Sequence, residues 1–90
     1  MPSRRVTISN RLGLHARPAM MLAACAASFS SNISIERIDG GDPVDAKSIM
    51  QLLMLAGTHG TQLRIEAEGG DAAKALDAIS TLFDSGFDDE

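Results

Sequence analysis

Aromatic residues and cysteine are scarce in this chain of 90 residues. It contains three Phe, no Trp and no Tyr, so the hydrophobic core has to be built mainly from Ala, Leu, Ile and Met. The single cysteine, Cys25, excludes an internal disulfide and indicates a reducing cytoplasm. Because Cys25 lies in an Ala-rich stretch, we expect it to be a small buried hydrophobic residue.

Long apolar runs are also absent. No apolar stretch approaches the roughly 20 residues that a helix needs to span a bilayer. The N-terminal "MPSRRVTIS" lacks the apolar segment that follows the arginines of a signal peptide. We therefore expect a cytoplasmic monomer with no membrane insertion, folded as one domain over residues 1–90.

Acidic residues are missing from the first third of the chain. Residues 1–35 contain four arginines and no acid, and Glu36 is the first acidic residue. The rest of the chain carries twelve acids, which makes the net charge −4. Overall acidity argues against a nucleic-acid partner, because phosphate-backbone binding needs a concentrated basic surface. A locally positive N-terminal third suits a small anion or an acidic protein.

Apolar periodicity and turn signals divide the chain into strands and helices. Strands are predicted at "RVTIS", "NISIERI" and "TQLRIEAE", with a short edge strand around Val44. Helices are predicted over residues 16–29, over "AKSIMQLLMLA" with a start at Asp45 or Ser48 and an end at Gly57, and from an Asp71 cap to Gly86. The acidic end, "DSGFDDE", is expected to be a solvated extension.

The three longer predicted strands each have one apolar and one polar face. In "TQLRIEAE", for example, Leu63, Ile65 and Ala67 alternate with polar side chains. A sheet of such strands is mainly antiparallel and is covered by helices on one side only. The sequence therefore predicts an α+β open-faced β-sandwich with the order βαββαβα, in which three helices cover one face of a four-stranded sheet.

The stretch "GLHARPA" places a histidine directly before a predicted helix. If the helix begins at Ala16, His15 is the N-cap residue and Pro18 lies in the first turn, where proline is tolerated. The N–H groups of Ala16 and Arg17 then have no acceptor within the helix, and such a helix end attracts anions. The guanidinium of Arg17 suits phosphate oxygens. A neutral imidazole is also nucleophilic and can accept a phosphoryl group on nitrogen.

Other interpretations of His15 remain open from spacing alone. His15 fits equally a surface residue in a loop, with Arg17 as a solvated charge. A metal site is not favoured, because His59 and Cys25 lack chelating spacing, and His59 fits a solvated turn residue. A Ser-His-Asp hydrolase is compatible with the spacing, but the Gly-x-Ser-x-Gly elbow is absent. Gly-x-Gly-x-x-Gly and P-loop motifs are absent as well, so no cofactor is expected.

Two stretches together resemble the HPr family, the histidine phosphocarriers of the bacterial phosphoenolpyruvate phosphotransferase system. They are "GLHARPA" and "DAKSIMQLLMLAGTHGTQLRIEAEG", and the resemblance covers essentially the whole chain. It implies the open-faced sandwich fold, phosphorylation of His15 on Nδ1, and assistance to phosphate transfer from Arg17. It also implies enzyme I as the phosphoryl donor and an enzyme IIA component as the acceptor. Such a protein is a stoichiometric carrier rather than a turnover enzyme.

Two stretches of the sequence favour one branch of this family. "HARPAM" and "LFDSGFDDE" resemble the nitrogen-branch carrier more than the sugar-transport carrier, which stays open as an alternative. A second alternative is a non-catalytic regulatory module of the same fold that acts by docking its apolar helix on a partner. His15 separates these hypotheses, because a purely regulatory protein does not need it.

Apolar residues on the first two predicted helices are candidates for partner docking. The stretch "IMQLLMLA" is apolar nearly all round, so part of its surface is expected to stay exposed. Leu52 and Leu55 fit the core, and Ser48 fits a helix cap or, by the resemblance, a regulatory serine phosphorylated where a dedicated kinase is encoded. The docking candidates are Met20, Met21, Ile49, Met50 and Leu53.

Overall fold

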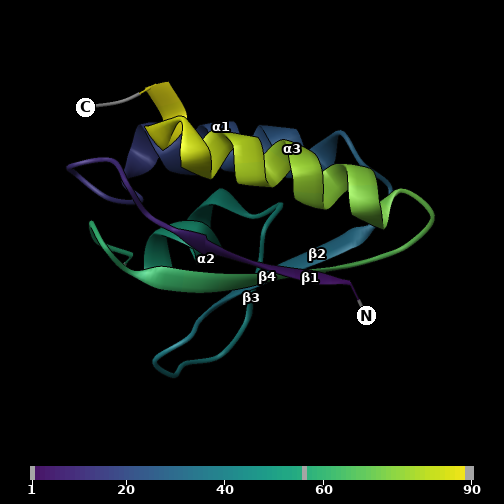
Figure 1. Ribbon diagram of the computed structural model, residues 1–90, viewed down its shortest axis with the longest axis horizontal. Helices are drawn as coiled ribbons and strands as arrows, with labels where there is room; N and C mark the ends of the chain where they lie inside the picture. The colour runs from purple at the N-terminus through teal and green to yellow at the C-terminus, as the bar shows by residue number, and fades with distance from the viewer. Residues whose placement is uncertain (1, 56, 89–90) are drawn as a thin grey trace.

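The computed structural model, which describes residues 2–55 and 57–88, has helices on one face of a four-stranded sheet (Figure 1). The strands are β1 (Ser3–Thr7), β2 (Asn32–Arg37), β3 (Val44–Asp45) and β4 (Gln62–Glu68). The helices are α1 (Ala16–Ala27), α2 (Ile49–Met54) and α3 (Ala72–Asp84), followed by a short 3-10 helix, η1 (Gly86–Asp88). The predicted element order and fold class are confirmed.

The sheet has the strand order β1-β4-β2-β3, and each of these pairings is antiparallel. In the centre, Ile65 of β4 pairs with Arg4 of β1 on one side and with Ile35 of β2 on the other. The apolar residues of β4 are buried while their neighbours are exposed or half-buried, as the alternation predicts. One face of the sheet is therefore apolar and covered, and the other is polar and open.

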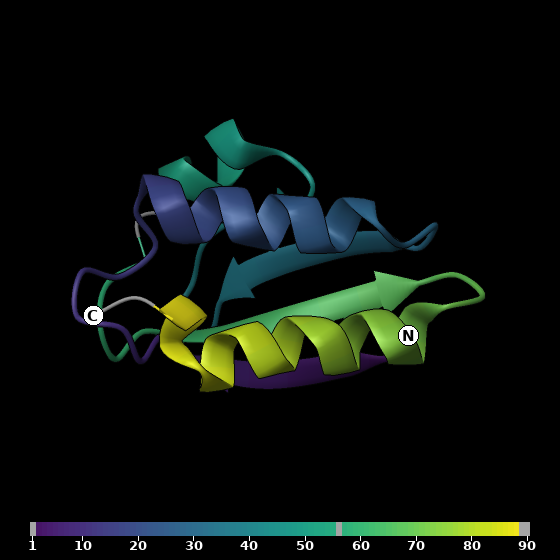
Figure 2. The same ribbon diagram turned by 90° about the horizontal axis from the view of Figure 1, so that it is seen from above.

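Three helices cover the apolar face of the sheet. The long helices α1 and α3 lie side by side above it, and α2 packs against the far side of α1 (Figure 2). Helix α1 buries mostly small side chains, Ala19, Ala23 and Ala26 beside Leu22, which lets it approach its neighbours closely. Helix α3 buries Leu76, Ile79 and Phe83 along one stripe, as predicted. Within the described part of the chain, the helices are too short or too polar to cross a bilayer.

Helix α2 is shorter than the sequence predicts. It begins after Ser48, one of the two predicted starts, but its last residue is Met54 rather than a residue next to Gly57. Leu52 and Leu55 are buried, which confirms their predicted place in the core. The last predicted helical residue, Ala56, lies outside the described residues. Gly57 instead packs closely on the core, because a Cβ there would meet Cδ1 of the buried Ile8.

The acidic end of the chain is not wholly a solvated extension, so that prediction is wrong for Phe87. This side chain is 0% exposed, and its ring lies edge-on to Phe83 with 4.9 Å between the ring centroids. Gly86, Phe87 and Asp88 all have positive φ, which folds the chain sharply back over the end of α3. The burial of one aromatic side chain outweighs the strain of this turn.

Asp71 occupies the N-cap position of α3, but its side chain makes no capping hydrogen bond. The predicted cap is therefore wrong in its role. One carboxylate oxygen accepts hydrogen bonds from the backbone N–H and the hydroxyl of Ser31, and the other accepts from the N–H of Ser30 at 2.9 Å. Asp71 thus links the start of α3 to the turn between α1 and β2. The several hydrogen bonds that its carboxylate accepts there are together stronger than a single capping bond.

We predict that protonation of Asp71 lowers the stability of the folded protein at acidic pH. The hydroxyl of Ser31 and the N–H of Ser30 lower the pKa of Asp71 from 3.8 to about 2. A carboxyl group with a lowered folded-state pKa stabilises the fold above its unfolded pKa, and this contribution is lost as the pH falls toward the folded value. Between about pH 4 and about pH 2, the melting temperature of Asp71→Asn should therefore fall less steeply than that of the wild type.

Thermal unfolding followed by circular dichroism measures this slope. Ser31→Ala removes the hydroxyl that contributes most to the lowered pKa of Asp71, so its slope should lie between those of the wild type and Asp71→Asn. Parallel curves for the three proteins would show that Asp71 does not couple folding to proton binding.

Candidate functional site

His15 is the N-cap residue of α1, as the sequence predicts. Its backbone is extended, with φ −87° and ψ −168°, and its carbonyl accepts the first helical hydrogen bond, from Ala19 N at 3.0 Å. The imidazole is half-buried and makes no capping bond to the helix. The ring therefore lies at the N-terminus of α1, beside the N–H groups of its first turn.

The first turn of α1 surrounds His15 with the groups that the sequence predicts. Ala16 and Arg17 are exposed, and Pro18, the third helical residue, is buried. The backbone N–H groups of this turn have no acceptor within the helix and carry the positive end of its dipole. Proline removes one such donor and fixes its own φ, which stiffens the turn. The site can hold an anion next to an imidazole.

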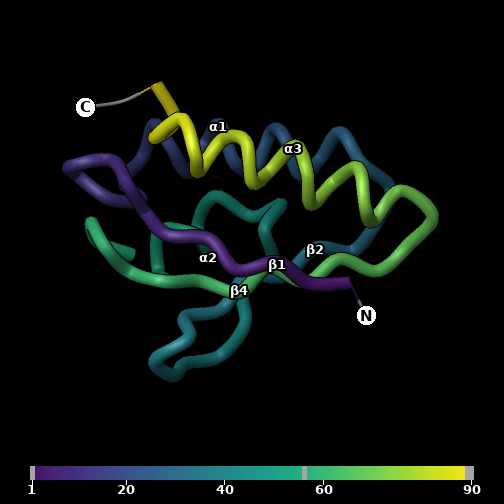
Figure 3. Tube along the Cα trace, viewed as in Figure 1, coloured from purple at the N-terminus to yellow at the C-terminus, as the bar shows by residue number. Residues whose placement is uncertain are grey.

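A tight connector leads from β1 to His15 and rests on the turn before β4 (Figure 3). Gly13 has φ +73°, and a Cβ added there would lie 2.5 Å from the carbonyl oxygen of Gly57 and 2.9 Å from Cα of Thr58. The N–H of Leu14 donates to the same carbonyl oxygen of Gly57 at 3.0 Å. Only glycine fits at position 13, and the close approach fixes where the chain enters the helix.

Ser48 is the N-cap residue of α2, one of the two roles that the sequence allows. Its Oγ accepts a hydrogen bond from the N–H of Gln51 at 3.2 Å. The amide of Gln51 reaches back, and its Oε1 accepts from the N–H of Asp45 at 2.9 Å. In a capping box the Gln51 side chain would accept from the N–H of Ser48 itself, whereas here it accepts three residues earlier, from Asp45. The two bonds together explain why so short a helix has a defined start. Ser48 is half-buried at the edge of the apolar residues of α2.

The apolar face of the molecule consists of exposed hydrophobic residues on α1 and α2 and in the connector. Met50 is 75% exposed and Met54 78% exposed, values far above those of core residues. Leu12 and Met54 were not among the candidates. Met54 continues the apolar stretch "IMQLLMLA", whereas Leu12 sits in a turn, where no periodicity marks it. The members of the apolar face are Leu12, Met20, Ile49, Met50, Leu53 and Met54.

Two side chains differ from their predicted burial. Met21 is half-buried and packs against the core, so it offers less surface for docking than the exposed Met20. Cys25 is half-buried rather than buried, and this partial burial raises the pKa of its thiol. His59 is exposed in a turn, as expected.

Within residues 2–55 and 57–88, the structure contains no group of three His, Cys, Asp or Glu side chains that could hold a metal ion.

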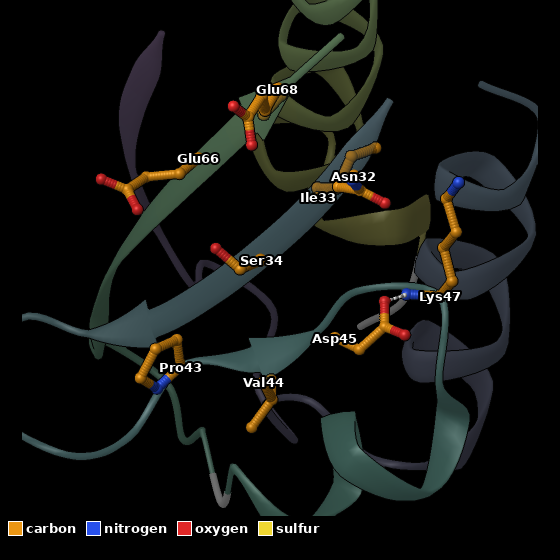
Figure 4. Close-up of a pocket in the computed structure, with 10 residues that line it drawn as sticks. Asn32, Ile33, Ser34, Pro43, Val44, Asp45, Lys47, Glu66 and Glu68 are labelled. Carbon is orange, nitrogen blue, oxygen red and sulfur yellow. Dashed lines mark hydrogen bonds between the residues drawn. The ribbon is translucent and has the colours of Figure 1, made fainter. Parts of the chain in front are cut away.

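A groove lies on the open side of the sheet (Figure 4). Glu66 and Glu68 of β4 line it on one side, and Asp45 and Lys47 line it on the other. The carboxylate of Asp45 accepts a hydrogen bond from the N–H of Lys47 at 2.9 Å, which keeps it within its own loop. None of the candidate site residues lines this groove.

Comparison with known proteins places the chain among phosphocarriers. A family model described as "PTS HPr component phosphorylation site" matches residues 2–85. The chain is 45% identical to phosphocarrier protein NPr of Proteus mirabilis, over 97% of this chain and 96% of the relative. It is 42% identical to phosphocarrier protein NPr of Escherichia coli K12, over 94% of this chain and 93% of the relative.

A solved structure supports the same grouping. The crystal structure of HPr-C-His from Thermoanaerobacter tengcongensis is 38% identical in sequence and has a TM-score of 0.92. The match covers 100% of this chain and 99% of that chain. The likeness therefore extends over the sheet, the helices and the connector that carries His15.

Proposed function

Because the chain belongs to the HPr family of phosphocarriers of the phosphotransferase system, we propose that it carries a phosphoryl group on His15 from phospho-enzyme I to an enzyme IIA component. One observation supports this role above the others: the half-buried imidazole of His15 stands at the N-terminus of α1, two residues before the exposed Arg17. The names of the two relatives, both NPr, favour the nitrogen-regulatory branch over the sugar branch.

The proposed reaction is a transfer between two nitrogen–phosphorus bonds. The lone pair of His15 Nδ1 attacks the phosphorus carried by enzyme I, a new N–P bond forms, and the bond to the donor breaks with its electron pair. The opposite ring nitrogen of His15 keeps its proton. In the next step the acceptor attacks the same phosphorus, and the imidazole leaves as the neutral base. No cofactor or metal takes part in either step.

The groups around His15 are suited to hold the transferred dianion briefly. The first-turn N–H groups of α1 contribute about 0.3–2 kcal/mol through the helix dipole. The exposed guanidinium of Arg17 can swing to the phosphoryl oxygens and donate charge-assisted hydrogen bonds as charge shifts between the nitrogens. Modest stabilisation suits a carrier, because a deeply stabilised phosphohistidine does not pass its phosphate onward.

The experiment that tests the proposal offers the purified protein phosphoenolpyruvate with enzyme I of the nitrogen branch or of the sugar branch. We expect one phosphoryl group per chain, in an acid-labile and alkali-stable bond, and faster labelling by the nitrogen-branch enzyme. An acid-stable label would indicate a hydroxyl acceptor and would refute the role of His15. Faster labelling by the sugar-branch enzyme would assign the protein to that branch.

We propose that the apolar face, together with part of Met21, is the surface on which enzyme I and enzyme IIA dock. The face combines adaptable methionines with branched side chains on two neighbouring helices, and α2 itself carries no charged residue. Most of these residues belong to α2 and to α1, the helix that begins directly after His15, so a partner that covers both helices comes close to the imidazole.

Met50→Glu should weaken docking without unfolding the protein. Met50 is 75% exposed, so the charge costs the fold little, whereas burying that charge in a complex opposes binding. We expect about a tenfold or greater rise in the dissociation constant for enzyme I, measured by calorimetry. The matched control is Ala73→Glu, which adds the same charge at an exposed position of α3. Equal affinities for the two variants would move the docking surface elsewhere.

We propose that Ser48 is a regulatory position as well as a helix cap, modified where a dedicated kinase is encoded. A phosphoserine at the start of α2 is compatible with the helix dipole, so the fold should tolerate it. The new dianion would stand next to Ile49 and Met50, where it opposes apolar burial against a partner. Phosphorylation of Ser48 would therefore slow the charging of His15 by weakening docking.

A further inference from the structure

The connector in front of His15 consists of two consecutive hydrogen-bonded turns. In the first, the N–H of Gly13 donates to the carbonyl oxygen of Asn10 at 3.2 Å. In the second, the N–H of His15 donates to the carbonyl oxygen of Gly13 at 3.0 Å. Both turns meet at Gly13, so the orientation of the Gly13 peptide sets the backbone position of His15.

The side chain of Asn10 is hydrogen-bonded to that peptide. Asn10 is 3% exposed, and its Nδ2 donates to the carbonyl oxygen of Gly13 at 2.6 Å. This oxygen thus accepts two hydrogen bonds, one from the side chain of Asn10 and one from the backbone of His15. A hydrogen bond in a buried setting is electrostatically stronger than one in water, and it is costly to leave half-made.

Residues at and just after the end of α3 lie next to Ser9 and Asn10. Gly86 is buried against it, because a Cβ added to Gly86 would lie 3.7 Å from Cβ of Asn10. The neighbouring residue, Ser9, donates from its Oγ to the carbonyl oxygen of Phe83 at 2.9 Å. Asn10 is therefore packed against the core on one side and bound to the His15 connector on the other.

We propose that Asn10 is a positioning residue for phosphoryl transfer, acting on His15 through the Gly13 carbonyl. The inference rests on the proposed function of His15. Transfer between two proteins requires the attacking nitrogen to be aligned with phosphorus, and a misplacement of about 1 Å can cost as much as a hundredfold in rate. The hydrogen bond from Asn10 to the Gly13 carbonyl limits such misplacement without contact between Asn10 and the phosphoryl group. The sequence signal for it is slight: asparagine at the first position of the turn "NRLG".

The test compares two variants of Asn10 with a control in the same loop. Asn10→Ala removes the donor, and Asn10→Asp keeps the shape but replaces the donor by an acceptor. Ser9→Ala is the control, because it cuts the bond from this loop to Phe83 and leaves the Gly13 carbonyl untouched. For each protein, the assay measures the rate of labelling by enzyme I across carrier concentrations, together with the imidazole signals of His15 by NMR.

We expect both Asn10 variants to lower the maximal labelling rate about tenfold or more, with a KM for the carrier within about twofold of wild type. The His15 imidazole signals should shift in these variants and stay unchanged in Ser9→Ala. If Asn10→Asp does not fold, because its carboxylate is buried against the Gly13 carbonyl oxygen, Asn10→Ala carries the test. Wild-type maximal rates in a folded Asn10→Ala protein would overturn the inference while leaving the proposed function intact. No labelling of the wild type would overturn the proposed function itself.

Discussion

Replacing His15 with alanine is expected to abolish phosphorylation by enzyme I and to leave the fold intact. The imidazole is the nitrogen nucleophile of the proposed site, so its removal leaves the phosphoryl group without an acceptor. Stability should change little, because the His15 side chain is only half-buried and its removal leaves no cavity inside the core. The backbone bonds of residue 15, to Gly13 and from Ala19, are retained in the variant. We expect no acid-labile label and a melting temperature within a few degrees of wild type.

The second histidine of the chain provides the matched control. His59 is exposed in the turn before β4, so His59→Ala removes an imidazole without touching the proposed site. It should accept phosphate at the wild-type rate. Full labelling of His15→Ala, or loss of labelling in His59→Ala, would assign the phosphorylated position to a residue other than His15. Mass spectrometry after alkaline handling locates the label directly.

Gly13→Ala should cause the largest loss of stability among the substitutions considered. With φ at +73°, alanine pays for a left-handed backbone, roughly 1–2 kcal/mol. Its Cβ would also lie 2.5 Å from the carbonyl oxygen of Gly57, a backbone atom that cannot rotate away. Forcing an extra methyl group into a packed site adds roughly 1–3 kcal/mol. For a domain of this size the melting temperature should then fall by roughly 10 °C or more.

Gly60→Ala separates the two causes of this loss. Gly60 also has positive φ, +89°, but an added Cβ there meets no atom within 4 Å. Its loss should therefore reflect the backbone strain alone and be smaller than that of Gly13→Ala in denaturant or thermal unfolding. Equal losses at the two positions would show that the connector does not rest closely on the turn at Gly57.

The strands and long helices could be predicted because their patterns are local. Alternation in "TQLRIEAE" and the apolar run after His15 each specify an element and its buried face. The errors fall where a distant residue decides the outcome. Asp71 is a good local cap by sequence, but Ser30 and Ser31, about 40 residues away, provide stronger donors. Phe87 has polar neighbours in sequence, yet it is buried against Phe83.

The candidate site could be predicted from the sequence because its residues all lie at the start of one helix. His15, Ala16, Arg17 and Pro18 are consecutive, and their proposed roles follow from the geometry of a first turn. The contacts that hold the connector before this turn could not be predicted, because they come from Gly57 and from the residues that follow α3, which are distant in sequence. Leu12 and Met54 escaped notice for a similar reason: exposure depends on which neighbours arrive in the folded state.

The buried Phe87 has a consequence for the order of events during synthesis. Its ring completes the core beside Phe83. Within the described residues, β1 pairs with a single strand, β4, which is synthesised more than 50 residues after β1. The core therefore cannot close until residue 87 has left the ribosomal exit tunnel. Until then β1 and the apolar α1 are exposed to solvent and to chaperones. Folding of this protein should accordingly be cooperative, because the core needs Phe87 together with the distant strands β1 and β4 before it is complete.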